Sequence, residues 1–232
     1  LGDSTREAIV YTPPSYDARP LARYPVLYLL PGMGEDQHAW TQQGHAAAIL
    51  DNLIAEGRAR EMIVVMEEAG TSRGLAGRGG RGRGRTEYGG NFPQMFITET
   101  LPMIDASYRT IPDREHRAIA GVSLGGTQAF QLTQENLEQF AYVGAFSAPF
   151  GYPAVPAGYN GLLARPDEFA QRFKLLFFSA GTGENLIAAQ VFHDQLDNAG
   201  VPHIFYEALG TLPGWQSWRP SLHEMAPLLF QD

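Results

Sequence analysis

Residues 121–125 read Gly-Val-Ser-Leu-Gly, so a serine stands between glycines two positions to either side. A strand-like run, 117–120, precedes this stretch, and a helix-like run, 124–134, follows it. Such a context is typical of a nucleophile elbow, a sharp strand-to-helix turn in which larger side chains at the flanking positions would collide. We therefore predict that Ser123 is a nucleophile. A pattern this short also arises by chance, and the strand and helix around it favour the functional interpretation.

The backbone around Ser123 predicts a place for negative charge. A helix that begins directly after the serine points free N–H groups at charge that forms on a substrate bound there. The N–H of Leu124 is the natural first donor of such an oxyanion hole.

The composition limits the other classes of function. With 232 residues, of which 44% are hydrophobic and 18% charged, the chain fits one globular α/β domain over 1–232. Its formal charge of −8 argues against a general affinity for nucleic acid. No run approaches the ~18 apolar residues of a membrane span. The lack of cysteine excludes disulfides and thiolate chemistry, and acyl transfer through serine needs no metal or organic cofactor, so we expect none.

Apolar runs that are typical of buried strands alternate with helix-like segments along the chain. The predicted strands are 7–12, 24–30, 62–66, 117–120, 142–146, 174–179 and 203–206, and the predicted helices are 46–55, 96–108, 124–134, 186–199 and 218–230. This alternation predicts an α/β-hydrolase fold, with a mostly parallel central sheet and helices on both faces. The loop after 24–30 should then share an edge of the sheet with the elbow.

Residues 70–90 interrupt this alternation. They contain almost no apolar side chains and carry arginines among glycines, at 73, 78, 81, 83 and 85. We predict a flexible surface loop or a flap beside the substrate. The alternative is an RNA-binding Arg-Gly segment, but this stretch is short and lies inside an acidic chain.

Beyond the elbow, the sequence resembles the esterase D group of α/β-hydrolases, the carbohydrate esterase family 1 that includes feruloyl and acetylxylan esterases. The similar segments are 11–17, 24–29, 32–36, 51–54, 108–118, 121–126 and 221–224. The resemblance implies a secreted or periplasmic serine carboxylesterase that forms an acyl-Ser123 intermediate. Its substrates would be acetyl or feruloyl esters of plant cell-wall carbohydrate, or small esters. The oxyanion hole would comprise the N–H groups of Met33 and Leu124.

The resemblance also implies a catalytic acid. Family members carry it after the strand that here ends near Ser179, and this chain has Glu184 at that place. The position fits the order serine, acid, histidine, and the alternative is a solvated loop carboxylate. Trp40, Tyr152 and Trp215 are predicted aromatic walls for a sugar or phenolic ring, with ordinary packing as the alternative.

The catalytic histidine of the family has no counterpart at its usual place. Relatives carry it shortly before a tryptophan, where this chain reads Gly-Thr-Leu-Pro-Gly-Trp at 210–215, with Pro213 at the histidine position. His38, in the loop after 24–30, is the predicted substitute base, and a plain loop histidine is the alternative. Loss of the base costs serine hydrolases on the order of 10⁶ in turnover. The alternative function is therefore an esterase-like protein that binds carbohydrate or aromatic esters without efficient turnover.

Overall fold

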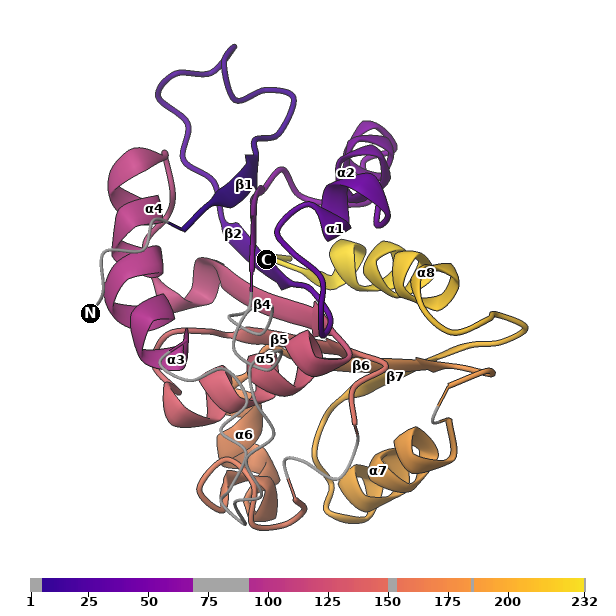
Figure 1. Ribbon diagram of the computed structural model, residues 1–232. Helices are drawn as coiled ribbons and strands as arrows, with labels where there is room; N and C mark the ends of the chain where they lie inside the picture. Colours follow the sequence, from indigo (N-terminus) through magenta and orange to yellow (C-terminus); the bar gives the residue numbers. More distant parts are fainter. Residues whose placement is uncertain (1–5, 69–91, 150–153, 185, 232) are drawn as a thin grey trace, which may run out of the picture.

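A seven-stranded sheet forms the framework of the computed structural model, which describes residues 6–68, 92–149, 154–184 and 186–231 (Figure 1). Its strands are β1 (Ala8–Tyr11), β2 (Val26–Leu30), β3 (Ile63–Glu67), β4 (Arg117–Val122), β5 (Tyr142–Phe146), β6 (Leu175–Gly181) and β7 (Ile204–Ala208). They lie in the order β1-β3-β2-β4-β5-β6-β7. Only β1 pairs antiparallel to its neighbour among these strands. The predicted mostly parallel sheet is confirmed.

The central strands are apolar throughout because both of their faces are covered. In β2, every residue is buried. Val26, Tyr28 and Leu30 pack into one hydrophobic cluster, whereas Leu27 and Leu29 pack into the other. Successive side chains of a strand point to opposite faces, so a strand buried on both sides needs an unbroken apolar run rather than an alternating one.

Helices cover the two faces of the sheet (Figure 1). One face carries α1 (Ala39–Gln42), α2 (Ala46–Ala55) and α8 (Trp215–Met225), the last continued by a 3-10 turn, Ala226–Leu228. The other carries α3 (Phe92–Met95), a π-helical turn (Phe96–Thr100), α4 (Leu101–Ser107), α5 (Leu124–Glu135), α6 (Pro166–Arg172) and α7 (Leu186–Asn198). Short 3-10 turns lie at Arg114–His116 and Leu162–Ala164.

Some predicted boundaries are wrong. Helix α8 begins at Trp215 rather than 218, because Gly214 serves as its N-cap. The sequence did not indicate α1, α3 and α6, which are short helices of four to seven residues. The predicted Arg/Gly loop at 70–90 lies outside the described residues. In the part of the chain that the structure describes, no helix is long and apolar enough to cross a membrane.

Parallel pairing brings the ends of the strands to one edge. Leu30 of β2 pairs with Gly121 of β4, and Val122 pairs with Phe146 of β5. On the far side, the last residue of β6, Gly181, pairs with the end of β7. The loops that follow these strands therefore meet at one edge of the sheet, where open parallel sheets form their binding sites.

Candidate active site

Ser123 lies at the corner between β4 and α5 in a strained backbone conformation, with φ 51° and ψ −116°. A residue with a side chain rarely adopts a positive φ, and it does so only where surrounding contacts hold it. Here the N–H of Ser123 donates to the carbonyl of Phe146 at 2.8 Å, and its own carbonyl accepts from the N–H groups of Gly126 and Thr127. The corner is thus held by backbone hydrogen bonds to β5 and within the first turn of α5.

Two glycines make this corner possible. A Cβ on Gly121 would lie 2.4 Å from the carbonyl carbon of Gly125, and a Cβ on Gly125 would lie 2.4 Å from the carbonyl oxygen of Pro31. Real side chains do not approach backbone so closely. Gly121 therefore lets the strand pass the helix, and Gly125 lets the start of the helix lie against the loop that follows β2.

That loop brings a second N–H group to the elbow. Within the described residues, the backbone N–H groups of Met33 and Leu124 donate no hydrogen bond. The Leu124 group lies at the N-terminus of a 12-residue helix, where the helix dipole favours negative charge. The oxyanion hole formed by these two N–H groups stays a prediction, with which their lack of a hydrogen-bond acceptor in the described residues is consistent.

Glu184 follows β6 and is held by four hydrogen-bond donors. One oxygen, Oε2, accepts from the Gly181 N–H at 2.8 Å and from the hydroxyl of Ser147. The other, Oε1, accepts from the Gly214 N–H at 3.0 Å and from the Ser217 hydroxyl at 2.7 Å. The carboxylate is therefore not a solvated loop group, and none of its partners is a histidine.

Pro213 lies directly beside this carboxylate. A Cβ on Gly183 would lie 2.7 Å from Cδ of Pro213, and the next residue, Gly214, donates to Glu184. The loop 209–214 between β7 and α8 thus occupies the place at which the resemblance implies a base. A proline ring has no atom that accepts a proton, so this loop does not complete a serine-histidine-acid triad.

His38 precedes α1 and is half-buried. Its backbone N–H donates to Asp36, and its carbonyl accepts from Thr41. Among the described residues, its imidazole ring forms no hydrogen bond or ion pair. The structure therefore gives no hydrogen bond that joins the predicted substitute base to Ser123 or to Glu184.

Glu35 is the residue that sequence reasoning missed. A Cβ built on Gly32 would lie 3.0 Å from Oε2 of Glu35 and 3.7 Å from Cβ of Ser123, so the carboxylate and the serine flank the same point. Glu35 accepts from the Gly32 N–H at 2.8 Å and from Nε1 of Trp215 at 3.0 Å. The available signal was the acidic pair Glu-Asp directly after the Pro-Gly-Met-Gly turn that ends β2.

The three predicted aromatic walls differ in position. Trp40 is 1% exposed, and its Nε1 donates to Leu30, so burial argues against direct contact with a substrate. Its ring packs edge-on against Trp215, with the centroids 5.0 Å apart. Trp215 is partly exposed and lines a groove of about 600 Å³ that also includes His45, Arg219 and His223. Tyr152 lies outside the described residues.

Comparison with known families agrees with this geometry. A family model described as "Putative esterase" matches residues 3–229. The chain belongs to this esterase family. One relative similar in sequence to this chain is an endo-1,4-beta-xylanase/feruloyl esterase of Xylanibacter ruminicola, which is 33% identical over 211 residues. The match covers 90% of this chain but 27% of the relative, so the chain spans about a quarter of that protein's length.

Solved structures extend the esterase comparison to the fold. A ferulic acid esterase is 32% identical, with a TM-score of 0.76, and the match covers 97% of this chain and 92% of that one. A second ferulic acid esterase, from Anaeromyces mucronatus, has a TM-score of 0.74 at 24% identity, over 97% of this chain and 90% of its own. The chain therefore has the α/β-hydrolase fold of these esterases.

Proposed function

We propose that this chain is a serine carboxylic-ester hydrolase that acts on feruloyl or acetyl esters of plant cell-wall carbohydrate, or on small esters. The observation that carries the proposal is the elbow, which holds Ser123 at φ 51° at the start of α5 and next to the loop at Gly32. The N–H groups of Leu124 and Met33, in this helix start and this loop, donate no hydrogen bond within the described residues. The substrate class is supported by the two feruloyl esterase relatives, which are 33% and 32% identical to this chain.

The reaction follows from the elbow. Oγ of Ser123 attacks the ester carbonyl carbon, and the N–H groups of Met33 and Leu124 stabilise the oxyanion that forms. When the intermediate collapses, the ester C–O bond breaks, the alcohol leaves with a proton, and the acyl group stays on Ser123. Water then attacks the acyl-serine and releases the carboxylic acid.

The serine proton needs an acceptor, and the loop after β2 supplies it in this proposal. Glu35 is a carboxylate beside Ser123, and its Oε2 lies on the side of Gly32 that faces the serine. His38, on the same loop, is the base that the sequence predicts. A positioned general base contributes about 10²- to 10⁴-fold to a rate, so the two residues are separable by kinetics.

The first test compares the parent chain with Ser123→Ala in the hydrolysis of methyl ferulate and of an activated acetyl ester. We expect the rate to fall to the background rate of the buffer in Ser123→Ala, because no other group can carry the acyl intermediate. Equal rates in the two proteins would contradict the proposed function.

The second test separates the two bases. We expect Glu35→Gln to lower kcat by about 10²-fold or more. Gln keeps the size of the side chain but has one accepting oxygen, so it can keep only one of the two hydrogen bonds that the Glu35 oxygens accept from Gly32 and Trp215. The Tm of the variant checks that the loop stays in place. His38→Ala should leave kcat nearly unchanged. The opposite result would assign the base to His38.

A second function is binding without efficient turnover. It is supported by Glu184, whose carboxylate already accepts four hydrogen bonds, and by Pro213, which has no proton acceptor in its side chain. It predicts near-background hydrolysis in the parent chain together with saturable binding of a feruloylated oligosaccharide. Calorimetric titration of the parent and of Trp215→Ala measures that binding. The substitution should weaken it if the groove beside Trp215 holds the ligand.

A further inference from the structure

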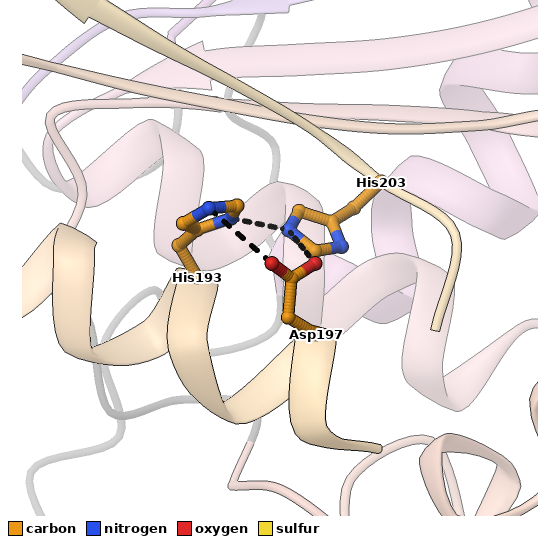
Figure 2. Close-up of side chains that lie close together, drawn as sticks. All are labelled: His193, Asp197 and His203. Carbon is orange, nitrogen blue, oxygen red and sulfur yellow. Dashed lines mark hydrogen bonds and ion pairs between the residues drawn. The ribbon is translucent and has the colours of Figure 1, made fainter. Parts of the chain in front are cut away.

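Two histidines and an aspartate meet on the far side of the sheet from α8. His193 and Asp197 lie one turn apart on α7, and His203 directly precedes β7. The three side chains point toward one another (Figure 2). Each offers a nitrogen or oxygen that can bind a metal, and these atoms all lie within 4.8 Å of one another.

The distances between these atoms are close to those of a metal site. Nδ1 of His193 lies 2.7 Å from Nε2 of His203. Oδ1 of Asp197 lies 3.8 Å from Nε2 of His203, and Oδ2 lies 3.6 Å from Nε2, the other ring nitrogen of His193. Around a tetrahedral zinc ion with bonds of about 2.0–2.1 Å, neighbouring ligand atoms are roughly 3.3–3.5 Å apart. Metal binding would require the partly exposed His193 ring to turn, so that its Nδ1 moves from 2.7 Å to that separation from Nε2 of His203.

The hydrogen bond from His203 to the backbone leaves the lone pair of its other ring nitrogen directed toward the cluster, where Nε2 is hydrogen-bonded to His193. Its Nδ1 lies 2.7 Å from the carbonyl oxygen of Val201. A carbonyl only accepts, so Nδ1 carries the hydrogen, and Nε2 bears the lone pair in the neutral ring. Metal-binding histidines are usually oriented by such a bond from their other nitrogen. The ring is also fixed in place, because its side chain is 3% exposed and stacks on Phe178.

We propose that His193, Asp197 and His203 bind one divalent transition-metal ion, with zinc as the best match. Two imidazole nitrogens and one carboxylate oxygen suit zinc rather than calcium or magnesium, which prefer oxygen ligands. The ion takes the place of the hydrogen that His193 and His203 share, and His193 then carries its hydrogen on Nε2. Water fills the fourth position, and the half-exposed carboxylate of Asp197 gives the ion a path from solvent.

The site joins α7 to the edge strand β7. It uses none of the residues around Ser123, so its role is to stabilise the fold. A ligand that binds only the folded state raises the stability in proportion to the logarithm of its concentration over Kd. β7 leads into the loop 209–214, and a metal ion at its start would strengthen the anchoring of the strand that carries this loop.

The test titrates chelator-treated protein, freed of any affinity tag, with zinc chloride in a calorimeter. We expect one ion per chain, and a rise in Tm of about 5–10 °C when free zinc is 100-fold above Kd. Asp197→Asn and His193→Gln should each weaken zinc binding by at least about tenfold. Both side chains are partly or largely exposed, so these variants should fold.

Two matched variants act as controls. Asp194→Asn changes an exposed aspartate on the same helix, outside the cluster. His116→Gln removes a histidine whose one ionic partner among the described residues is Asp113, at 2.7 Å. Both should bind zinc as the parent does. Cobalt should give the intense visible absorption of a four-coordinate site in the parent and lose it in Asp197→Asn. The proposal is overturned if the parent binds no stoichiometric zinc, or if the two cluster variants bind it as tightly as the controls do.

Discussion

The elbow at Ser123 and the carboxylate at Glu184 lie on the same edge of the sheet, but they differ in what holds them. At the elbow, backbone bonds and two glycines hold the serine, while the hydroxyl makes no hydrogen bond within the described residues. At the second position, four donors from the ends of β5, β6 and the start of α8 bind the carboxylate. The first group is free to react, and the second is engaged in the fold.

The difference has a structural explanation in α8. Its N-cap is Gly214, which has no side chain to cap the helix. Glu184 takes over that role from another element, because it accepts from the Gly214 N–H and from Ser217 in the first turn. A carboxylate at a helix N-terminus is favoured by the free N–H groups and by the helix dipole. The acid can therefore be retained for stability even without a histidine to orient.

The largest effect on ester hydrolysis is expected from a substitution that disrupts the elbow. Gly121→Val places a branched side chain where a single Cβ would already lie 2.4 Å from backbone. We expect loss of ester hydrolysis comparable to that of Ser123→Ala, together with a marked fall in Tm, measured by calorimetry. Gly57→Ala is the control, because φ is +69° there but no atom lies within 4 Å. It should cost only about 1 kcal/mol through backbone strain and leave the rate unchanged. Full activity in Gly121→Val would mean that the elbow is not strained by its neighbours.

The elbow could be predicted from sequence because its requirements are local. Glycine at 121 and 125 follows from steric collisions within a few residues, and the buried parallel strands follow from unbroken apolar runs. The environment of Glu184 could not be predicted, because its donors come from Ser147, Gly214 and Ser217, which are far apart in sequence. Glu35 was missed for the same reason, since its place beside Ser123 depends on how two loops pack. Short helices such as α6 carry too few residues for a periodic pattern.

A smaller effect on ester hydrolysis is expected from a substitution that adds a proton acceptor near Glu184. Pro213→His introduces a proton acceptor next to Gly183 and the Glu184 carboxylate. We expect ester hydrolysis to rise by at least about tenfold, below the 10²–10⁴ of a well-positioned base, because Glu184 is already bound by four donors. Rates with methyl ferulate measure the gain. Pro213→Ala removes the ring without adding a base and should give no gain. If histidine and alanine behave alike, the loop 209–214 does not direct position 213 toward Ser123.

A further prediction concerns stability rather than turnover, and it uses a carboxylate with few partners as the contrast to Glu184. Glu67 ends β3 and is 5% exposed. Its partners in the described residues are the hydroxyl of Thr100, at 3.0 Å, and Arg6, at 3.9 Å. Burial raises the pKa of Glu67 from 4.5 to about 7, although the hydrogen bond from Thr100 and the charge of Arg6 act in the opposite direction.

Because the pKa of Glu67 is higher in the folded state, the unfolded chain loses this proton first as the pH rises. The free energy of unfolding should therefore fall between about pH 4.5 and pH 7, by on the order of 3 kcal/mol, and stay lower above that range. Glu67→Gln should remove this part of the pH dependence, as measured by urea unfolding at pH 5 and pH 8. Glu99→Gln, which changes an exposed carboxylate lining the same cavity as Arg6 and Glu7, should keep it. Both variants keep every histidine, so the difference between their pH dependences of unfolding free energy reports Glu67 alone. An identical pH dependence in both would mean that Glu67 is already ionised in the folded protein at pH 5.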